Sequence, residues 1–458
     1  MVRSFYSTIR PVLAGLALFE AGAGLHAQVG PGSPYSSFAF GDLLRGTQVS
    51  PMLMGDAGVA VVDPAGVLQV NPASYTGLRT TVFETGARMR YASLRNDVQD
   101  TYSRNTRWLG FSLGVPFGNG RCGWAMGLQP VTEVSYRLID REVLPDGGGD
   151  VEYLYRGEGG LNRAYMGLGW AVYQQKDSLK LGNGSRLSIG ANFNYLFGHV
   201  DRFRETIYPR GSGYNNHRYL STLSLSDPVF NFGVHYQTDL VKRREKGDEG
   251  LKLVVGATAE LPATLNVSRS DLAYSFVVGA NGVETIRDTL IDQRKVPGTL
   301  GLPMQVGLGA TIYNVRWTWT FEMRTRDWSG TALNVEGYRF PEKLGRSSSY
   351  ALGASWRPMG AREGGNFLQR SIWRAGFRWT EDYLVVKEKQ LTDFGMAFGT
   401  SLPLLGSLTR SRLNFGAVFG RRGSAGTGTI QENYVDILIG LTFTPSKFEP
   451  WLQKRRIN

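Results

Sequence analysis

Cysteine is almost absent from this 458-residue chain, and so are long apolar runs. The only cysteine, Cys122, has no second thiol in the chain with which to form a disulfide or a multi-cysteine metal site. After residue 27, no stretch approaches the roughly 18 to 20 consecutive apolar residues that a membrane-spanning helix requires. The sequence therefore excludes an internal disulfide framework and a helical membrane protein.

Signatures of catalysis and of cofactor binding are also missing. The four histidines, at positions 26, 199, 217 and 235, lack the spacing of metal ligands, and the chain has no Gly-x-Ser-x-Gly elbow or phosphate-binding loop. His199 and His217 have Asp201 and Ser212 nearby in the sequence, which we interpret as coincidence. We therefore expect no enzyme, no cofactor and no metal ion.

The positive charge of the chain is not concentrated anywhere. The chain has 51 Lys and Arg against 39 Asp and Glu, a formal net charge of +12, but the basic residues are scattered singly. No basic helix or zinc motif accompanies them, so we expect no nucleic-acid partner.

The first 27 residues have the order of a secretory signal peptide. Arg3 and Arg10 precede an apolar run over residues 11–19, and small residues then lead to a cleavage site after Ala27. Glu20 and Leu25 fit this pattern imperfectly, and the alternative is a buried helix. Export to the outer membrane of a Gram-negative bacterium, with residues 1–27 removed, is the expectation.

From about residue 80 to the end, apolar and polar side chains alternate with a period of two. Trp317, Trp319, Phe321 and Met323, for example, alternate with Thr318, Thr320, Glu322 and Arg324. This period is that of a strand with one apolar face, and a helix would mix the two sets on one stripe. About fourteen strands are predicted, near residues 80–94, 106–117, 122–137, 161–175, 186–200, 217–239, 251–267, 303–314, 316–327, 347–357, 371–384, 390–401, 411–422 and 430–443.

The connections between these strands alternate between short turns and long polar loops. The long ones cover residues 138–160, 201–216, 268–302 and 328–346, a pattern typical of outer-membrane barrels with long extracellular loops. A soluble sandwich or propeller is the alternative, but many of the predicted strands are longer than the five or six residues usual there. The predicted fold is an all-β, transmembrane antiparallel β-barrel of about fourteen strands, with residues 80–443 forming its wall.

A barrel of this width needs something inside it, because side chains alone do not fill the lumen. Residues 28–79 show no clear periodicity and are rich in Gly, Pro, Ser and Ala, so we expect them to form an N-terminal hatch in the lumen. The strand phase points eleven charged side chains of the wall inward: Glu84, Arg88, Arg90, Glu133, Arg137, Arg163, Glu322, Arg324, Arg378, Arg412 and Asp436. It also points inward a set of glycines, which either admit another backbone or relieve curvature: Gly167, Gly169, Gly307, Gly309, Gly395, Gly399, Gly416 and Gly420.

One motif in this N-terminal segment is familiar. Gly55 and Gly58 are the two glycines of a Gly-Asp-Ala-Gly-Val-Ala stretch over residues 55–60. Asn71-Pro72-Ala73 follows shortly before the first predicted strand. This arrangement resembles the hatch of the FadL/TodX family of outer-membrane transport proteins. Residues 33–43 are similar to the start of a less characterised branch of the same family. The resemblance implies a fourteen-stranded barrel with an N-terminal plug.

The resemblance also implies an inward kink in the third strand, through which hydrophobic cargo passes sideways into the bilayer. Gln129 and Pro130 are the candidates for this kink, because proline lacks the N–H that a ladder needs. A plain bulge is the alternative. Asp227-Pro228 and Leu261-Pro262 are similar interruptions, so proline alone does not identify a gate.

Two functions follow from this resemblance. The first is passive transport of a hydrophobic small molecule, of the long-chain fatty acid or aromatic hydrocarbon type, with membrane lipids and the cargo as partners. The second is that of the PorV-type members of the family, which act as outer-membrane scaffolds or shuttle partners in protein secretion. The tail, residues 444–458, is expected in the periplasm, and its basic part from residue 447 is either a site for a protein partner or merely solvated.

Overall fold

The computed structural model describes residues 32–44, 46–96, 100–144, 149–175, 182–245, 248–279, 281–336, 343–360, 366–404, 410–424 and 429–445. The expected signal peptide and the basic part of the tail lie outside these ranges.

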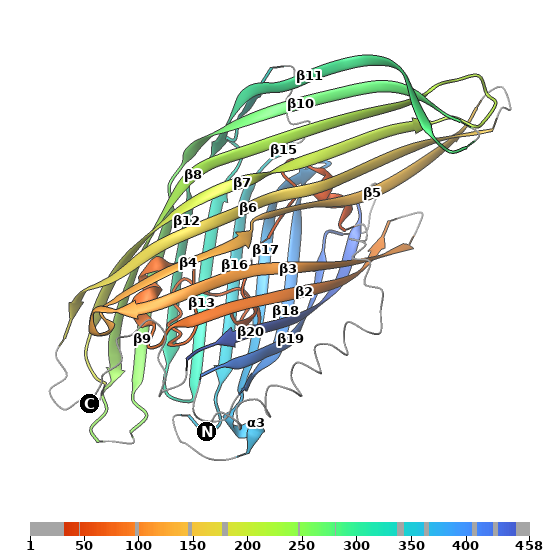
Figure 1. Cartoon of the computed structure of the whole chain (residues 1–458). Helices are drawn as coiled ribbons and strands as arrows, with labels where there is room; N and C mark the ends of the chain where they lie inside the picture. Colours follow the sequence, from red (N-terminus) through yellow and green to blue (C-terminus); the bar gives the residue numbers. More distant parts are fainter. Residues whose placement is uncertain are drawn as a thin grey trace, which may run out of the picture. The chain divides into compact units, whose positions relative to one another are not determined.

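Fourteen consecutive antiparallel partners close a barrel (Figure 1). The closing pair joins the first and last wall strands, from Phe83 opposite Phe443 to Arg95 opposite Gln431. The predicted fold, a fourteen-stranded transmembrane antiparallel barrel, is therefore confirmed. In ring order the strands are β2 (Val82–Arg95), β3 (Asp100–Phe117), β4 (Cys122–Pro130), β6 (Asp150–Gln174), β7 (Arg186–Ile207), β8 (Asn216–Val241), β9 (Leu251–Glu260), β12 (Gln305–Tyr313), β13 (Trp317–Asp327), β16 (Arg346–Trp356), β17 (Ile372–Val386), β18 (Lys389–Pro403), β19 (Arg412–Arg422) and β20 (Gln431–Phe443).

Further strands continue some of these around the ring. They are β5 (Thr132–Val143) after β4, β10 (Ala263–Val278) after β9, β11 (Glu284–Leu302) before β12, β14 (Leu333–Val335) after β13, and β15 (Lys343–Leu344) before β16. Short turns include the 3-10 helix η3 (Gly118–Gly120) and the helix α3 (Phe367–Arg370). No helix among the described residues is long and apolar enough to cross a membrane.

The alternation in the sequence separates the two faces of the wall. In β13, Trp319 is 54% exposed on the outside, whereas Glu322 is 1% exposed on the inside. Large apolar side chains cover the outer face of the neighbouring strands in the same way, such as Leu308, Leu352 and Phe377. This outward apolar band is the surface that meets lipid in a spanning barrel.

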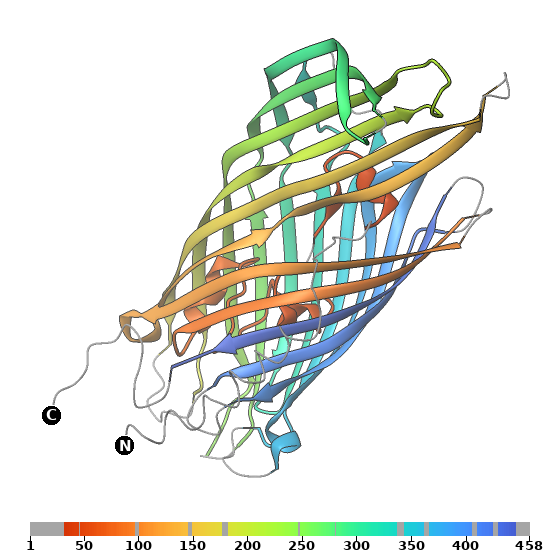
Figure 2. The same ribbon diagram turned by 45° about the vertical axis from the view of Figure 1, so that its right-hand side comes forward.

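Two of the four predicted long loops, 138–160 and 268–302, are wrong because most of their residues are strands, and half of a third, 201–216, is strand as well. The upper parts of β5, β6, β7, β8, β10 and β11 pair side by side and form a sheet extension beyond the closed ring (Figure 2). Residues 137–143 of β5 and 284–295 of β11 are exposed on both faces. With water on both faces no apolar alternation is needed, so the sequence pattern contains no strand signal there.

The N-terminal segment contains only short elements and lies against inward-facing residues of the wall (Figure 1). Its elements are η1 (Pro34–Ser37), β1 (Asp42–Leu43), α2 (Val49–Met52) and η2 (Pro72–Gly77). Most of its larger apolar side chains are buried, among them Tyr35, Leu53, Tyr75 and Leu78. We call residues 32–44 the latch segment and residues 46–79 the inner segment.

Candidate functional site

The third position of the wall is broken. β4 ends at Pro130 and pairs with both β3 and β6, whereas β5 starts at Thr132 and pairs with β6 but with no residue of β3. Residues 100–110 of β3 pair only with β2 among the described strands. The sequence candidates Gln129 and Pro130 thus lie directly before a gap in the wall. Just before this gap, Gln129 Nε2 donates a hydrogen bond of 3.4 Å to Ser112 Oγ of β3.

The two other proline interruptions have no such effect. β8 runs unbroken through Asp227 and Pro228, in continuous register with β7. Leu261 and Pro262 separate β9 from β10, but both strands remain paired with β8. Only the interruption at Pro130 leaves two described neighbouring strands unpaired over a long stretch.

Glu133 bridges this gap with its side chain. It lies in β5 and is buried, and its carboxylate forms ion pairs with Arg107 of β3 at 2.7 Å and with Arg88 of β2 at 3.4 Å. Asn105 of β3 donates a further hydrogen bond of 2.6 Å to it. The structure therefore brings together Glu133 and Arg88, which the strand phase had placed in the lumen without a partner.

The latch segment covers the free edge of β5. β1 pairs with β5, with Asp42 opposite Glu133 and Leu43 opposite Thr132, and Leu44 N–H donates to Val131 O at 2.8 Å. Further along the same edge, the Ser36 hydroxyl accepts a hydrogen bond of 3.1 Å from Ser135 N–H. Backbone groups that the gap would leave unpaired are thus satisfied by the latch segment.

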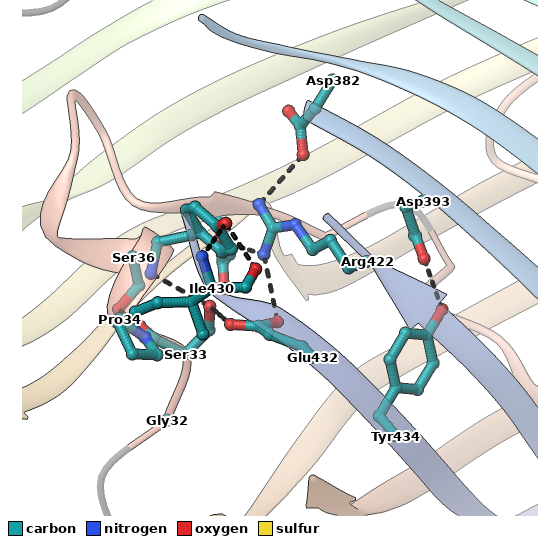
Figure 3. A network of polar contacts seen from close by, with 12 residues as sticks. Gly32, Ser33, Pro34, Ser36, Asp382, Asp393, Arg422, Ile430, Glu432 and Tyr434 are labelled. Atoms are coloured by element: carbon teal, nitrogen blue, oxygen red, sulfur yellow. Dashed lines mark hydrogen bonds and ion pairs between the residues drawn. The ribbon is translucent and has the colours of Figure 1, made fainter. Parts of the chain in front are cut away.

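A polar network fastens the latch segment to the opposite side of the gap (Figure 3). Arg422 of β19 forms ion pairs with Asp42 at 2.7 Å, with Asp382 at 2.9 Å and with Glu432 at 3.9 Å. Ser33 donates a short hydrogen bond to Glu432. One guanidinium therefore holds three carboxylates, a half-buried one from the latch segment and two buried ones from the wall.

Two tyrosines complete this fastening. The Tyr35 hydroxyl donates to Ile430 O at 2.6 Å and accepts from Ile430 N–H at 3.0 Å. The Tyr383 hydroxyl of β17 donates to Gly41 O at 2.6 Å. The sequence analysis did not predict this network. The two-residue alternation nevertheless points Arg422 to the same side of β19 as Gly420, and Glu432 to the same side of β20 as Asp436.

Behind the latch segment lies an apolar cluster. Tyr35 and Phe40 pack within it, and Leu43 and Val131 pack against it at the break in the wall. Its other buried members are Ala39, Leu161, Leu196, Leu223, Leu225, Val229, Leu265, Val267, Leu300, Leu302, Trp328, Leu333, Val335, Leu344, Tyr383, Leu384 and Leu391. The inner face of the wall is thus apolar next to the gap, and the protein's own N-terminal side chains occupy it.

The Asn71-Pro72-Ala73 motif starts η2 and ties it to the wall. Asn71 is fully buried, and its side-chain oxygen caps the helix by accepting from Ala73 N–H at 3.1 Å, with Pro72 in the first turn. Its side-chain nitrogen donates to Val59 O at 2.7 Å and to Val234 O of β8 at 3.3 Å. The residue therefore joins two parts of the inner segment to each other and to the wall.

The glycine motif meets three of the predicted inward charges. Glu322 accepts hydrogen bonds of 2.6 Å from both Gly58 N–H and Val59 N–H, and it forms an ion pair with Arg324 at 2.6 Å. Arg324 donates to the Asp56 carbonyl at 2.8 Å, and Arg378 of β17 forms a short ion pair with the Asp56 carboxylate. Buried backbone and charge of the inner segment are thus matched by the wall.

Other predicted lumen charges also form polar contacts, whereas Arg137 is exposed in the sheet extension. Arg90 pairs with Asp436 at 2.6 Å and Arg163 with Glu260 at 2.9 Å, both between wall strands. Glu84 accepts a hydrogen bond of 2.9 Å from Val67 N–H of the inner segment. Among the described residues, no group of three or more His, Cys, Asp or Glu could hold a metal ion.

Wall glycines provide room for the inner segment. A Cβ at Gly353 would lie 2.6 Å from Met54 O, and one at Gly169 would lie 2.6 Å from Pro72 O. Gly376 is tighter still, because its missing Cβ position is taken by the backbone of Gly55, which adopts a left-handed φ of +72°. Gly395 and Gly420 differ, since a Cβ there meets residues of the wall, Val418 first in the case of Gly395 and Tyr434 in the case of Gly420. The inward glycines thus have two uses, and those facing the inner segment admit its backbone.

Comparisons with known proteins agree with this architecture. The model of the BamG family matches residues 8–458 of the chain. No curated protein matches the sequence at a significant level.

Two solved structures are similar in fold at low sequence identity. The toluene transporter TodX of Pseudomonas putida is 14% identical, with a TM-score of 0.52, and the match covers 88% of this chain and 100% of that one. A FadL homologue of Pseudomonas aeruginosa is 12% identical, with a TM-score of 0.50, covering 87% and 98%. The expected FadL-like outer-membrane barrel is confirmed as a fold, while the matching family model carries a different name.

Proposed function

The chain belongs to the BamG family, and we propose that it is a passive outer-membrane pathway for hydrophobic small molecules of the long-chain fatty acid or aromatic hydrocarbon type. In this proposal the sheet extension faces the outside and the short turns face the periplasm, the usual orientation of outer-membrane barrels. Cargo reaches the apolar cluster from outside and leaves sideways into the bilayer through the gap between β3 and β5. The cargo class agrees with that of the toluene transporter in the comparison.

The contact between the apolar cluster and the gap is the observation that carries this proposal. Val131, at the break itself, and Leu43, in the strand that covers it, both pack against the cluster that contains Tyr35 and Phe40. An apolar molecule within the cluster is therefore one layer of side chains away from the opening in the wall. A polar solute gains nothing from such a lining, whereas an alkyl or aromatic surface gains roughly 25 cal/mol per Å² buried.

Opening requires the latch segment to leave its place. Cargo that replaces Phe40 and Tyr35 supplies apolar surface of its own, so the apolar area buried in the cluster changes little. The polar contacts of Asp42 and Ser33 with Arg422 and Glu432 then determine most of the free energy of opening. Transport in this scheme depends on how firmly that network holds.

A reversible disulfide tests the proposal. Leu43 and Thr132 are opposite each other in the β1–β5 pair, a separation that a disulfide can bridge. In a Cys122→Ser background, the L43C/T132C variant should take up a labelled alkane or toluene at the wild-type rate when reduced and lose uptake when oxidised. The matched control is T311C/T320C, an opposed pair between wall strands β12 and β13 that does not involve the latch segment.

The outcomes are distinct. If the oxidised L43C/T132C barrel transports as fast as the reduced one, release of the latch segment is not part of the pathway. If oxidation of the T311C/T320C control abolishes uptake equally, the loss reflects a general effect of cross-linking and the proposal has no support.

One observation favours a second function, that of a scaffold or shuttle partner in protein secretion. Residues 284–295 of β11 are exposed on both faces, and among the described strands they pair only with β10. A strand edge of this length is a surface to which another polypeptide can add a strand. Recovery of a stoichiometric protein partner together with an empty lumen in native mass spectrometry would replace the transport proposal with this one.

A further inference from the structure

A cavity separate from the apolar cluster lies in the lumen at the short-turn end of the barrel. Its volume is about 770 Å³, and it lies between the inner segment and the starts of β7 and β17. Arg374 lines it near the start of β17, whereas Asp382 of the latch network lies eight residues further along the same strand, roughly 26 Å away at about 3.3 Å per residue. The two sites therefore occupy opposite halves of the lumen.

The lining of this cavity is strongly basic. Two acidic side chains line it, Asp63 and Glu84. Two of the basic side chains have their charge matched, because Arg316 pairs with Glu249 at 2.7 Å and Lys252 pairs with Asp239. The basic lining residues are Arg79, Arg121, Arg186, Lys252, Arg316, Arg357 and Arg374.

The other five arginines have no carboxylate within ion-pair distance in the described part of the chain. Arg79 and Arg186 converge on the same two acceptors. Arg186 donates to Gly120 O at 2.7 Å and to Thr76 O at 3.0 Å, and Arg79 donates to the same oxygens at 3.5 and 3.3 Å. The two positively charged guanidinium groups are therefore held close together by neutral carbonyl oxygens, which do not neutralise their charge.

Two of these guanidiniums are buried as well as uncompensated. Arg186 is 9% exposed and Arg374 is 7% exposed, and the Nε atom of each has no hydrogen-bond partner among the described residues. Within the same residues, the one hydrogen bond of the Arg374 side chain is a short one to the Ser401 hydroxyl. Buried charge without a counter-charge is costly, and a wall that retains two such groups around one cavity, beside three more arginines without a carboxylate partner in the described part of the chain, is arranged for an anion.

We infer that this basic cavity binds a soluble small molecule carrying two or more phosphate groups, which enters from the short-turn end. The planar guanidinium presents a fork of N–H donors that matches the oxygens of a phosphate group, and several forks around one space favour a polyanion over a monovalent ion. The site is independent of the proposed hydrophobic pathway.

Binding of inorganic pyrophosphate to the folded full-length barrel tests this inference. Titration calorimetry in detergent, at constant ionic strength, should give saturable binding at one site per chain. Arg186→Gln should weaken pyrophosphate binding at least tenfold. Arg79→Gln should weaken it measurably but less, because the Arg79 side chain is exposed. Arg294→Gln is the matched control, since Arg294 lies in the sheet extension away from the cavity and pairs with Asp292.

The inference is overturned if pyrophosphate heats match those of sodium chloride at equal ionic strength, or if R79Q and R186Q bind as wild type does. Should R186Q fail to show the gel mobility of a folded barrel, R79Q decides the matter, because that side chain is exposed in the structure. Hydrocarbon uptake by R79Q should remain at the wild-type rate, which separates failure of this site from failure of the proposed pathway.

Discussion

Removing the carboxylate of Glu322 should release the inner segment while leaving the barrel intact. Its carboxylate accepts N–H groups from Gly58 and Val59, both at 2.6 Å, and pairs with Arg324. In Glu322→Ala both backbone donors lose their acceptor, and Arg324 loses its carboxylate. All of these groups lie at the interface between the inner segment and β13. The substitution therefore lowers the stability of the docked inner segment.

The size of the effect follows from the number of contacts. Hydrogen bonds to a charged group contribute about 1.5–3 kcal/mol each, so the two bonds to Glu322 amount to about 3–6 kcal/mol. Leaving one partner of a buried ion pair alone costs about 3–5 kcal/mol, which agrees in scale. Taking about 3 kcal/mol as the lower limit, the population with the inner segment undocked should rise more than about 100-fold.

Hydrogen exchange of the barrel in nanodiscs measures this population. The peptide that contains Gly58 and Val59 should exchange at least about 100-fold faster in E322A, whereas peptides from β17 to β20 should be unchanged. The matched control is Glu260→Ala, because Glu260 is also buried but pairs with Arg163 and Arg326 within the wall. The reasoning is refuted if exchange at Gly58 and Val59 is unaffected in E322A, or if E260A accelerates it to the same degree.

Three further predictions concern other contacts. Gly376→Val should expose residues 46–79 to protease without unfolding the barrel, because the new side chain occupies the space of the inner segment's backbone; Gly301→Val, with no atom nearer than 3.8 Å to its Cβ, should not. Arg422→Gln should make residues 32–44 exchange faster, since three carboxylates lose their cation; unchanged exchange would contradict the role of the network. A hydrogen bond from Arg218 lowers the pKa of Glu284 from 4.5, so this pair's contribution is fully present above about pH 4.5 and is lost as the pH falls through the lowered value. Exchange at the tip of β11 should show that dependence in the wild type and not in E284Q.

The strand count was predictable because most of the wall has different surroundings on its two faces. Lipid on one side and a filled lumen on the other force the two-residue alternation seen in β13, and the same phase placed Glu322 and Arg324 inward. The sheet extension was missed for the same physical reason. Residues 284–295 of β11 have water on both faces, so hydrogen bonding to β10 holds them in a strand without any trace in the apolar pattern.

The candidate site was only partly predictable. Pro130 marks the break by its chemistry, since it has no N–H for the ladder. The segment that covers the break could not be deduced from the sequence. Asp42 and Arg422 are separated by 380 positions, and no local pattern around either residue indicates that the two form a pair. Charge and phase indicate which wall residues point inward, whereas their partners in an irregular segment depend on how that segment folds inside.

The pairing of β2 with β20 sets an order of events for biogenesis. The seam pairs the first wall strand with the last, so the ring cannot close before β20 is in place. In the closed ring, Glu322, Arg378 and Arg422 meet Gly58, Asp56 and Asp42 inside the lumen. A chain that stops before β20 therefore leaves these side chains on an open sheet.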